Sequence, residues 1–364
     1  TSKSAKLIPA YISAKKDIFL TDAVLTLIWQ LHFGKYNPRY RLSQLDDSTF
    51  VGFKVDSVLQ RAIDAQKLEQ EILLAQPRDS VYRRLQGYLE HAIDKKPNFS
   101  ETDREEWRLI AINLERCRWY PAEGTISVDI NIPAFNLAFR HPGGEDLYRV
   151  IVGKPSTPTP SLHSNIRFLT TAPDWNVPAG IFRKEVLPRA LSRPAYLAEN
   201  NMAIYDRKGR IISPTDQNLQ LVRRNPSDYL ARQSPGCDNA LGRIVFNFSN
   251  PYSVYLHDTP NHLLFNERHR AFSHGCIRLD NPEKFVSVLL KTLSAPPEVH
   301  KSVIRAMDRY ERFRYDLPTP VPISIRYLTC TMETGKLIRY PDIYGKDKRL
   351  IAAFFEAESI KQVE

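Results

Sequence analysis

The sequence lacks several features that would place the chain in a specialised class of protein. Among its 364 residues there is no run of about 18 apolar residues, so no segment is predicted to span a membrane. Its four cysteines include no C-x-x-C pair, which excludes zinc-finger and thioredoxin-like sites. We find no internal repeat, no low-complexity tract and no dense run of lysine and arginine. The composition, 42% hydrophobic and 25% charged, is that of an ordinary globular protein.

Length and charge limit the number of domains and the kind of partner that the chain can have. A chain of 364 residues predicts two domains, each large enough for its own core. The net charge of +10 favours an anionic partner, but no nucleic-acid recognition motif accompanies it. Two interpretations of the charge therefore stay open, a solvated basic surface and the binding of an anionic polymer.

The first third of the chain has helical spacing. Residues 1–20 show little pattern and are expected to form an extended lead-in. Apolar residues then recur at helical spacing over 23–31, 56–74 and 81–93. The sequence Ser-Glu-Thr-Asp at 100–103 is typical of a capping box before a fourth helix. An all-α domain is predicted for residues 1–120.

After residue 120 the period changes to that of β-strands. Strict alternation over 126–132 is followed by short predicted strands at 136–139, 147–152 and 244–248, and 322–331 alternates as a late strand. A mainly β domain is predicted for 121–345, with a tail at 346–364. Residues 179–240 form a long insertion with a hairpin at 202–212, and such an insertion is either a subdomain or a lid.

One cysteine stands in a context that suggests chemistry. Cys276 lies in the sequence Ser-His-Gly-Cys-Ile-Arg-Leu, directly after Gly275, which permits a tight turn. A helix is predicted to begin at Asn281, so we expect Cys276 at or just before a helix N-terminus. The partial positive charge there, together with Arg278, would favour the thiolate. The alternative is a small buried hydrophobic side chain.

A base for that cysteine is available upstream. His257 lies on a predicted strand, 19 residues before Cys276, and Tyr255 shares its face. This separation leaves room for a strand and a returning loop, so the imidazole and the sulfur could meet. A core histidine with no chemical role is the alternative.

A metal site is the competing chemistry in the same region. The residues His257, His262, His269, His274 and Cys276 are close together in sequence, but they lack spacings such as H-x₃-H or C-x₂-C. We therefore expect no metal and no cofactor.

At these residues the sequence resembles the L,D-transpeptidase family, whose signature is a strand histidine followed by Ser/Thr-His-Gly-Cys-x-Arg. His257 and residues 273–278 match it. Further segments that resemble the larger, Gram-negative branch of the family lie at 131–133, 150–154, 172–178 and 235–243. The resemblance implies an α+β protein, in which an all-α scaffold domain precedes a mainly β catalytic domain with a lid insertion.

The chain also departs from that branch. There, the helical scaffold is expected to carry an inserted peptidoglycan-binding module. Only residues 95–99 separate the third and fourth predicted helices, which leaves no room for such a module. Wall anchoring through a dedicated module is therefore not expected.

The resemblance implies a two-step acyl transfer on peptidoglycan stem peptides. Cys276, with His257 as its base, would attack the carbonyl of the L-centre of diaminopimelate in a tetrapeptide stem and release D-alanine. Backbone N–H groups of Gly275 and Cys276 would hold the oxyanion, and an amine of a neighbouring stem would resolve the thioester into a 3-3 cross-link. His274 would line the site by its backbone and packing. Arg278 would raise the local potential or hold the loop through carbonyls.

Four further residues are expected to contact substrate. Tyr255 would orient the substrate and Trp175 would form a wall of the donor cleft, although both could be packing residues. Ser273, within the signature, and Asn239, within the segment 235–243, complete the expected set.

Other outcomes use the same residues. Water as acceptor would give an L,D-carboxypeptidase, a lipoprotein lysine would give a wall anchor, and attack one residue earlier would give 1-3 cross-links. A wall-binding scaffold that has lost activity is the non-enzymatic alternative. A papain-type peptidase is excluded, because its histidine would follow the cysteine at a distance.

The family also implies a setting. We expect a periplasmic protein of a Gram-negative cell that acts in cell-wall biogenesis and cell shape, with its export signal outside this numbering. Stem peptides, and other cell-wall synthases, are the expected partners, and nucleic acid is not. Carbapenem β-lactams are expected to acylate Cys276.

Overall fold

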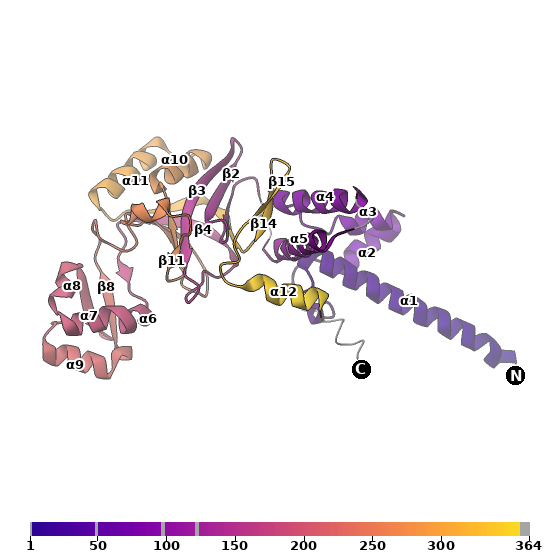
Figure 1. Cartoon of the computed structure of the whole chain (residues 1–364), viewed down its shortest axis with the longest axis horizontal. Helices are drawn as coiled ribbons and strands as arrows, with labels where there is room; N and C mark the ends of the chain where they lie inside the picture. The colour runs from indigo at the N-terminus through magenta and orange to yellow at the C-terminus, as the bar shows by residue number, and fades with distance from the viewer. Residues whose placement is uncertain (1, 48–49, 96–98, 121–123, 357–364) are drawn as a thin grey trace. The chain divides into compact units, whose positions relative to one another are not determined.

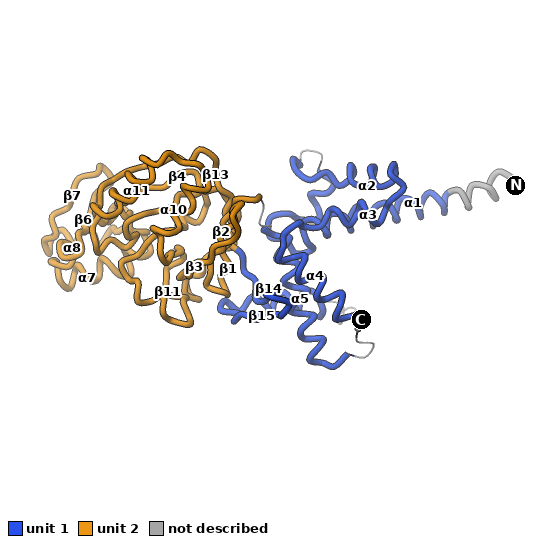
Figure 2. The backbone as a smooth tube through the Cα atoms, turned by 90° about the horizontal axis from the view of Figure 1, so that it is seen from above, with its two compact units in different colours: residues 1–123, 326–364 blue, residues 124–325 orange. Residues whose placement is uncertain are grey.

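The computed structural model describes residues 2–47, 50–95, 99–120 and 124–356. The chain divides into two compact units, residues 1–123 together with 326–364, and residues 124–325 (Figure 2). We call them the helical unit and the catalytic unit. The sequence assigned residues 326–345 to the β domain and 346–364 to a tail, whereas the compact unit that contains them is the helical one.

The helical unit begins with one long helix where an extended lead-in was expected. Helix α1 runs over Ser2–Phe33 (Figure 1), so the expectation for residues 1–20 is wrong. Every residue from 11 to 20 is exposed. A helix segment that buries no face needs no apolar periodicity, and for that reason the pattern carried no signal.

The other predicted helices are present, with one division. Residues 56–74 form two helices where one stretch was expected, separated at Gln66, whose φ is +53°. The capping box is confirmed, because the Ser100 hydroxyl accepts from the N–H of Asp103 at 3.2 Å and the Ser100 N–H donates to the Asp103 carboxylate at 3.0 Å. The remaining helices before residue 120 are α2 Val55–Asp64, α3 Leu68–Leu73, α4 Ser80–Lys95 and α5 Glu101–Trp119.

The C-terminal segment joins this unit through its core and through a buried ion pair. It consists of a hairpin, β14 Cys330–Glu333 and β15 Lys336–Arg339, followed by α12 Lys346–Phe355. Leu328 and Cys330 pack against helices α4 and α5 in one apolar cluster. The Arg326 guanidinium is bonded to the Asp79 carboxylate, and both side chains are almost entirely buried. These contacts explain why the segment belongs with the helices.

The catalytic unit is built on a nine-stranded sheet with the order β11-β3-β12-β10-β9-β4-β13-β1-β2. Strand β3 also pairs with β2, so the sheet closes on itself. The strands predicted at 126–132, 136–139, 147–152 and 244–248 all belong to it. The bounds are β1 Ser127–Asn131, β2 Asn136–His141, β3 Gly144–Gly153, β4 Leu162–Thr171, β9 Ile244–Phe248, β10 Leu256–His257, β11 Ala271–Ser273, β12 Ile277–Leu279 and β13 Arg314–Arg326.

Two helices lie between strands β12 and β13, α10 Pro282–Thr292 and α11 Pro297–Arg309 (Figure 1). Phe285 of α10 lies edge-on to three aromatic rings of the sheet, at centroid distances of 4.9–5.4 Å. One of these rings belongs to Phe246, which pairs across the sheet with Leu256. The neighbours of these residues, Val245 and His257, therefore point to the opposite face.

The insertion is a subdomain with a core of its own. It holds a four-stranded sheet, β5-β8-β6-β7, with helices α6 to α9 gathered beside β8 in Figure 1. Ten buried apolar residues fill it, among them Phe182, Leu197, Ile204 and Leu219. The hairpin predicted at 202–212 is confirmed as β6 and β7. The bounds are β5 Trp175–Asn176, α6 Ala179–Ile181, the π-helical turn Phe182–Val186, α7 Leu187–Ser192, α8 Ala195–Glu199, β6 Met202–Asp206, β7 Ile211–Ile212, α9 Asp216–Arg224 and β8 Tyr229–Gln233.

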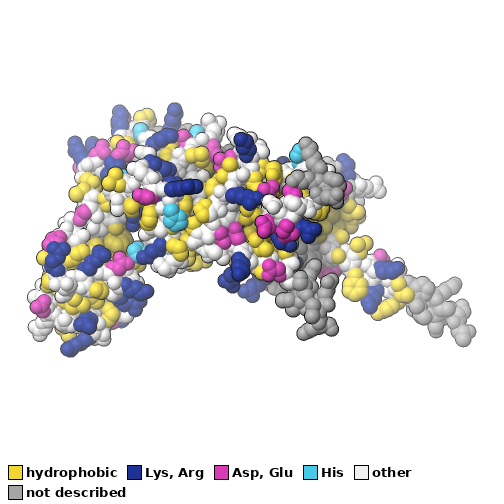
Figure 3. All heavy atoms as spheres, in the orientation of Figure 1, with side chains coloured by type: hydrophobic (Ala, Val, Ile, Leu, Met, Phe, Trp, Pro, Cys, Tyr) yellow, Lys and Arg dark blue, Asp and Glu magenta, His cyan; other side chains and the backbone are white. Residues whose placement is uncertain are grey.

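Among the helices of the described part of the chain, none has both the length and the apolar character needed to cross a membrane. On the face in view in Figure 3, lysine and arginine side chains alternate with acidic ones. The basic side chains on this face therefore form no single basic patch.

The buried ion pair of the helical unit gives a stability prediction. Replacing Asp79 by Ala removes the carboxylate while the Arg326 charge stays buried, so the free energy of unfolding should fall by about 3–5 kcal/mol. Arg339→Ala removes an exposed partner of Glu106 and should cost no more than about 1 kcal/mol. Urea unfolding of both variants measures the difference. Equal losses would show that the buried pair does not hold the C-terminal segment.

Candidate active site

Cys276 lies in the turn between strands β11 and β12 and not at the start of a helix. Residues 277–279 pair with both β3 and β10, and helix α10 begins only at Pro282. Asn281 precedes that helix in the left-handed conformation and makes no side-chain cap. The expectation that a helix N-terminus activates the thiol is therefore wrong, because that effect fades within one turn.

The turn itself is held by the serine of the motif. The Ser273 hydroxyl donates to the Cys276 carbonyl at 2.5 Å and accepts from the Gly275 N–H at 3.1 Å. Gly275 has a φ of +119°, a conformation that an L side chain rarely adopts. Ser273 is 2% exposed, and it lines the same cavity as Cys276.

A proline-rich loop supports this turn from the other side. The Thr157 hydroxyl donates to the Ser273 carbonyl at 3.2 Å, and the Thr159 hydroxyl donates to the Gly275 carbonyl at 2.8 Å. At Gly153 a Cβ atom would lie 2.2 Å from the Thr157 carbonyl oxygen, so only glycine lets the loop approach. No local pattern shows that these two threonines hold the catalytic turn, because each bonds to a residue 116 positions away.

The Cys276 sulfur is largely enclosed. Its Sγ lies 3.9 Å from the Ser253 carbonyl, within reach of a weak hydrogen bond. Burial raises the pKa of the Cys276 thiol, while the Tyr255 N–H and the charge of Arg278 act against that rise. The net direction is upward, so the thiol form is favoured, the opposite of the thiolate expected from the sequence.

His257 is buried beside the cysteine, with 3% of its surface exposed. Its Nδ1 lies 2.5 Å from the carbonyl oxygen of Asp258, so Nδ1 carries the proton and Nε2 is the basic nitrogen. Burial and then the charge of Arg278 lower the pKa of His257 to about 3, with the carbonyls of Asp258 and Leu241 opposing. Within the described part of the chain no hydrogen bond joins the ring to Cys276, and at neutral pH both groups are uncharged.

The strand end that carries His257 is fixed by the next residue. The Asp258 carboxylate accepts from the Arg243 N–H at 2.9 Å and from its Nε at 3.3 Å. A Cβ atom at Gly242 would lie 2.6 Å from the Asp258 side chain. This close approach holds the chain that presents the imidazole.

Arg278 stands directly beside His257 in the parallel pairing of β10 and β12. Its Nε is buried without a hydrogen-bond partner. Burial lowers the pKa of Arg278, and the proximity of Cys276 opposes that change. The guanidinium therefore contributes positive potential to the site, the first of the two roles expected from the sequence.

These groups line a cavity of about 520 Å³, the catalytic cavity. One wall comes from the sheet and the catalytic turn, and the other comes from the insertion. Cations from both walls, Arg278, Lys184 and Arg189, line it together. Other residues that line it are Trp175, Glu185, Leu241, His257, His274 and Cys276.

His274 connects the catalytic turn to the insertion. Its Nε2 lies 2.6 Å from the Glu185 Oε1, and Glu185 belongs to the π-helical turn 182–186. The sequence predicted a role for the His274 backbone and packing, and the side-chain contact was not foreseen. No pattern around Glu185 marks it, because its partner lies 89 residues away.

The remaining residues that the sequence predicted to contact substrate do not all line the catalytic cavity. Trp175 lines the catalytic cavity, but Tyr255 lines only a neighbouring one. Asn239 is fully buried and lines neither, and its amide donates to the carbonyls of Pro173 and Ser234 at 3.1 and 2.9 Å. Asn239 therefore holds the loop that follows β8, and the structure brings it into no cavity.

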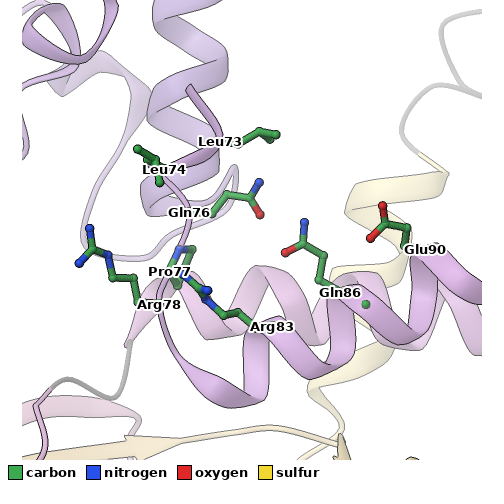
Figure 4. Close-up of a pocket in the computed structure, with 9 residues that line it drawn as sticks. Leu73, Leu74, Gln76, Pro77, Arg78, Arg83, Gln86 and Glu90 are labelled. Carbon is green, nitrogen blue, oxygen red and sulfur yellow. The ribbon is translucent and has the colours of Figure 1, made fainter. Parts of the chain in front are cut away.

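The other places that could hold a site offer fewer reactive groups. No group of three or more His, Cys, Asp or Glu among the described residues could hold a metal ion. Of the other cysteines, Cys117 and Cys330 are buried in the helical unit and Cys237 is exposed. A hollow of about 360 Å³ in the helical unit has no nucleophile and is lined by Leu73, Leu74, Gln76, Pro77, Arg78, Arg83, Gln86, Gly87 and Glu90 (Figure 4).

Comparison with known proteins assigns both units. Residues 125–301 match the model of the L,D-transpeptidase catalytic domain, and residues 2–89 match a Scaffold domain. A protein of Haemophilus influenzae (strain Rd) named "Putative L,D-transpeptidase" is 32% identical over 273 residues, which are 74% of this chain and 55% of that protein. The chain thus spans about half the length of this relative.

Two solved structures are also similar. An L,D-transpeptidase from Mycobacterium smegmatis is 14% identical, with a TM-score of 0.25 over 55% of this chain and 58% of that one. Mycobacterium tuberculosis L,D-transpeptidase 1 is 12% identical, with a TM-score of 0.21 over 55% and 60%. The two domain matches define the class, a catalytic domain joined to a scaffold. Residues 125–301 are an L,D-transpeptidase catalytic domain.

The raised pKa of Cys276 gives a pH prediction. Only the thiolate reacts with iodoacetamide, so the labelling rate of Cys276 should climb by about tenfold per pH unit and still be climbing above pH 9. Peptide mapping by mass spectrometry separates Cys276 from Cys237, which is exposed and serves as the internal comparison. A rate that levels off below pH 8 would instead indicate a preformed thiolate–imidazolium pair.

Proposed function

We propose that the chain is a peptidoglycan L,D-transpeptidase that uses Cys276 as its nucleophile and His257 as its base. The observation that carries the proposal is that a thiol, a neutral imidazole and a guanidinium line one cavity beneath an insertion. The substrates are stem peptides, and the expected product is a 3-3 cross-link. The proposed setting is the periplasm, in cell-wall biogenesis and cell shape.

The first step needs a base, because the enclosed Cys276 favours its thiol form. His257 Nε2 takes the proton as the sulfur attacks the carbonyl of the L-centre of diaminopimelate. The Gly275 N–H is already bonded to Ser273, so the Cys276 N–H and the Arg278 guanidinium are the proposed partners of the oxyanion. An oxyanion donor commonly contributes about 2.7–4 kcal/mol.

Collapse of that intermediate breaks the bond to D-alanine. With a pKa of about 3, the His257 imidazolium is a strong acid and gives its proton readily to the departing amine. The product is a thioester on Cys276. An amine of a second stem then attacks the thioester carbonyl, the C–N bond forms, the C–S bond breaks, and His257 accepts the proton lost by the amine.

The composition of the walls supports an anionic peptide substrate. Stem peptides carry free carboxylates, and Lys184 and Arg189 face the cavity from the insertion, opposite Arg278. The His274 to Glu185 contact holds that wall to the catalytic turn. We therefore propose that residues 179–240 cap the site, and that Trp175 contacts the donor stem.

Two other acceptors, and one other donor position, fit the same catalytic residues. Water gives an L,D-carboxypeptidase, a lipoprotein lysine gives a wall anchor, and a donor cut one residue earlier leads to 1-3 cross-links. A silent wall-binding scaffold is disfavoured, because binding alone does not require a thiol and a buried imidazole in one cavity.

Product analysis tests the proposal. Incubation with purified disaccharide-tetrapeptides should release D-alanine and give a cross-linked dimer, and fragmentation by mass spectrometry should place the bond at 3-3. Cys276→Ala should abolish both products, whereas Cys237→Ala, which removes an exposed thiol outside the cavity, should leave them unchanged. Tripeptide without dimer would identify water as the acceptor, and no product from the unaltered protein would contradict the mechanism.

Carbapenems give a second, independent test. The strained β-lactam carbonyl should acylate Cys276 and add the mass of one inhibitor to the intact protein. Cys276→Ala should show no adduct, and Cys237→Ala should show the full one. An adduct that persists in Cys276→Ala would place the reactive group elsewhere.

A further inference from the structure

A second cavity, of about 290 Å³, adjoins the catalytic cavity. The two share Trp175 and Leu241 as lining residues. Cys276 does not line the second cavity, but Tyr255 does, two residues before His257. We call this second cavity the sheet groove, because its floor is formed by strands β4, β9 and β13.

The floor of the sheet groove continues the row of cross-strand side chains to which His257 belongs. In the sheet register Arg278 pairs with His257, His257 with Val245, Val245 with Thr170, and Thr170 with Arg314. Cross-strand partners point to the same face. Val245, Thr170 and Arg314 all line the groove, so a single row leads from His257 into it.

The groove is long enough for a peptide. Three strand steps separate β10 from β13, which at the usual strand spacing is roughly 14 Å. Four extended residues span about 13 Å. A stem peptide lying across the strands would therefore reach from His257 to Arg314.

The lining has groups that suit such a peptide. The Asn247 amide, 3.3 Å from the Thr170 hydroxyl, places amide and hydroxyl groups on the floor. The Arg314 guanidinium lies over the Phe168 ring at 3.8 Å. Near it, Arg312 is held by Asp174 at 2.8 Å.

Both arginines are able to change partners. Their side chains are 68% and 57% exposed. The partner of Arg314, Asp316, is exposed too, whereas the partner of Arg312, Asp174, lines the groove and is 26% exposed. Exposed ion pairs contribute little to stability, so an incoming carboxylate can replace them at small cost. Arginine also binds carboxylates through two parallel hydrogen bonds.

We propose that the sheet groove binds the acceptor stem peptide, with its carboxylates at Arg312 and Arg314. The inference rests on the proposed transpeptidase function. The donor must occupy the catalytic cavity, because its carbonyl bonds to the Cys276 sulfur. The acceptor amine must lose a proton to His257. The sheet groove lies along the row of cross-strand partners that begins at His257, so a peptide in the groove can bring its amine to that residue. In this arrangement the amine nitrogen bonds to the thioester carbon, the sulfur leaves, and the proton passes to His257 Nε2.

The experiment separates the two half-reactions. The double variant Arg312→Glu/Arg314→Glu places two negative charges where the acceptor carboxylates would bind. With disaccharide-tetrapeptides, D-alanine release should stay within about twofold of the unaltered protein, and dimer formation should fall by about fivefold or more. Tripeptide should increase in proportion, because water then resolves the thioester.

Matched variants control for charge and folding. Arg309→Glu reverses an exposed arginine of α11 that lines neither cavity, and it should leave the dimer yield unchanged. Arg312→Lys/Arg314→Lys should retain most of the dimer. If the double glutamate variant fails to fold, Arg314→Gln decides, since it keeps the side chain on Phe168 and should still lower the ratio of dimer to tripeptide.

The outcomes distinguish a failure of the acceptor-site inference from a failure of the proposed transpeptidase function. An unchanged ratio of dimer to tripeptide in an active enzyme would overturn the groove while leaving the transpeptidase in place. An equal loss of D-alanine and dimer in Arg314→Gln would place the groove on the donor side and would also overturn the inference. If the unaltered protein releases no D-alanine, the proposed function fails and the inference fails with it.

Discussion

The parallel pairing of the two-residue strand β10 with β12 is the constraint on which the site depends. It sets His257 beside Arg278 and directs both side chains to the sheet face opposite helix α10. A slip of one residue would turn the imidazole into the apolar layer beneath Phe285. The brace between Asp258 and Arg243, and the turn held by Ser273, both act to fix this register.

The electrostatics of the site follow from that arrangement. A buried guanidinium beside a buried imidazole keeps the imidazole neutral, and burial of the thiol keeps the sulfur protonated. The pair is therefore an uncharged acid and base at rest, and charge develops only as substrate reacts. A site of this kind has little intrinsic reactivity toward stray electrophiles, because the thiolate forms only when the proton can move to His257.

Short-range patterns predicted the elements, and long-range packing set the rest. The motif identified Cys276 and His257, which share one cavity, and alternation found the strands that carry the sheet. The exposed start of α1 gave no pattern, because it buries nothing. The contact between His274 and Glu185 depends on how the insertion folds back, which no local signal encodes. The predicted thiolate failed because burial raises the pKa of the Cys276 thiol, and because strand β12 and two further residues separate Cys276 from the helix that was expected to activate it.

The division of the chain into units has an architectural meaning. The helical unit is interrupted after residue 123 and resumes at residue 326, so the whole catalytic unit is an excursion from it. The first and last strands of that excursion, β1 and β13, are neighbours in one sheet. The strands at its entry and exit are therefore both held in the same sheet. The catalytic unit is therefore an insertion whose two ends lie a fixed distance apart. Another folded unit with the same distance between its ends could take its place without a change in the helical unit.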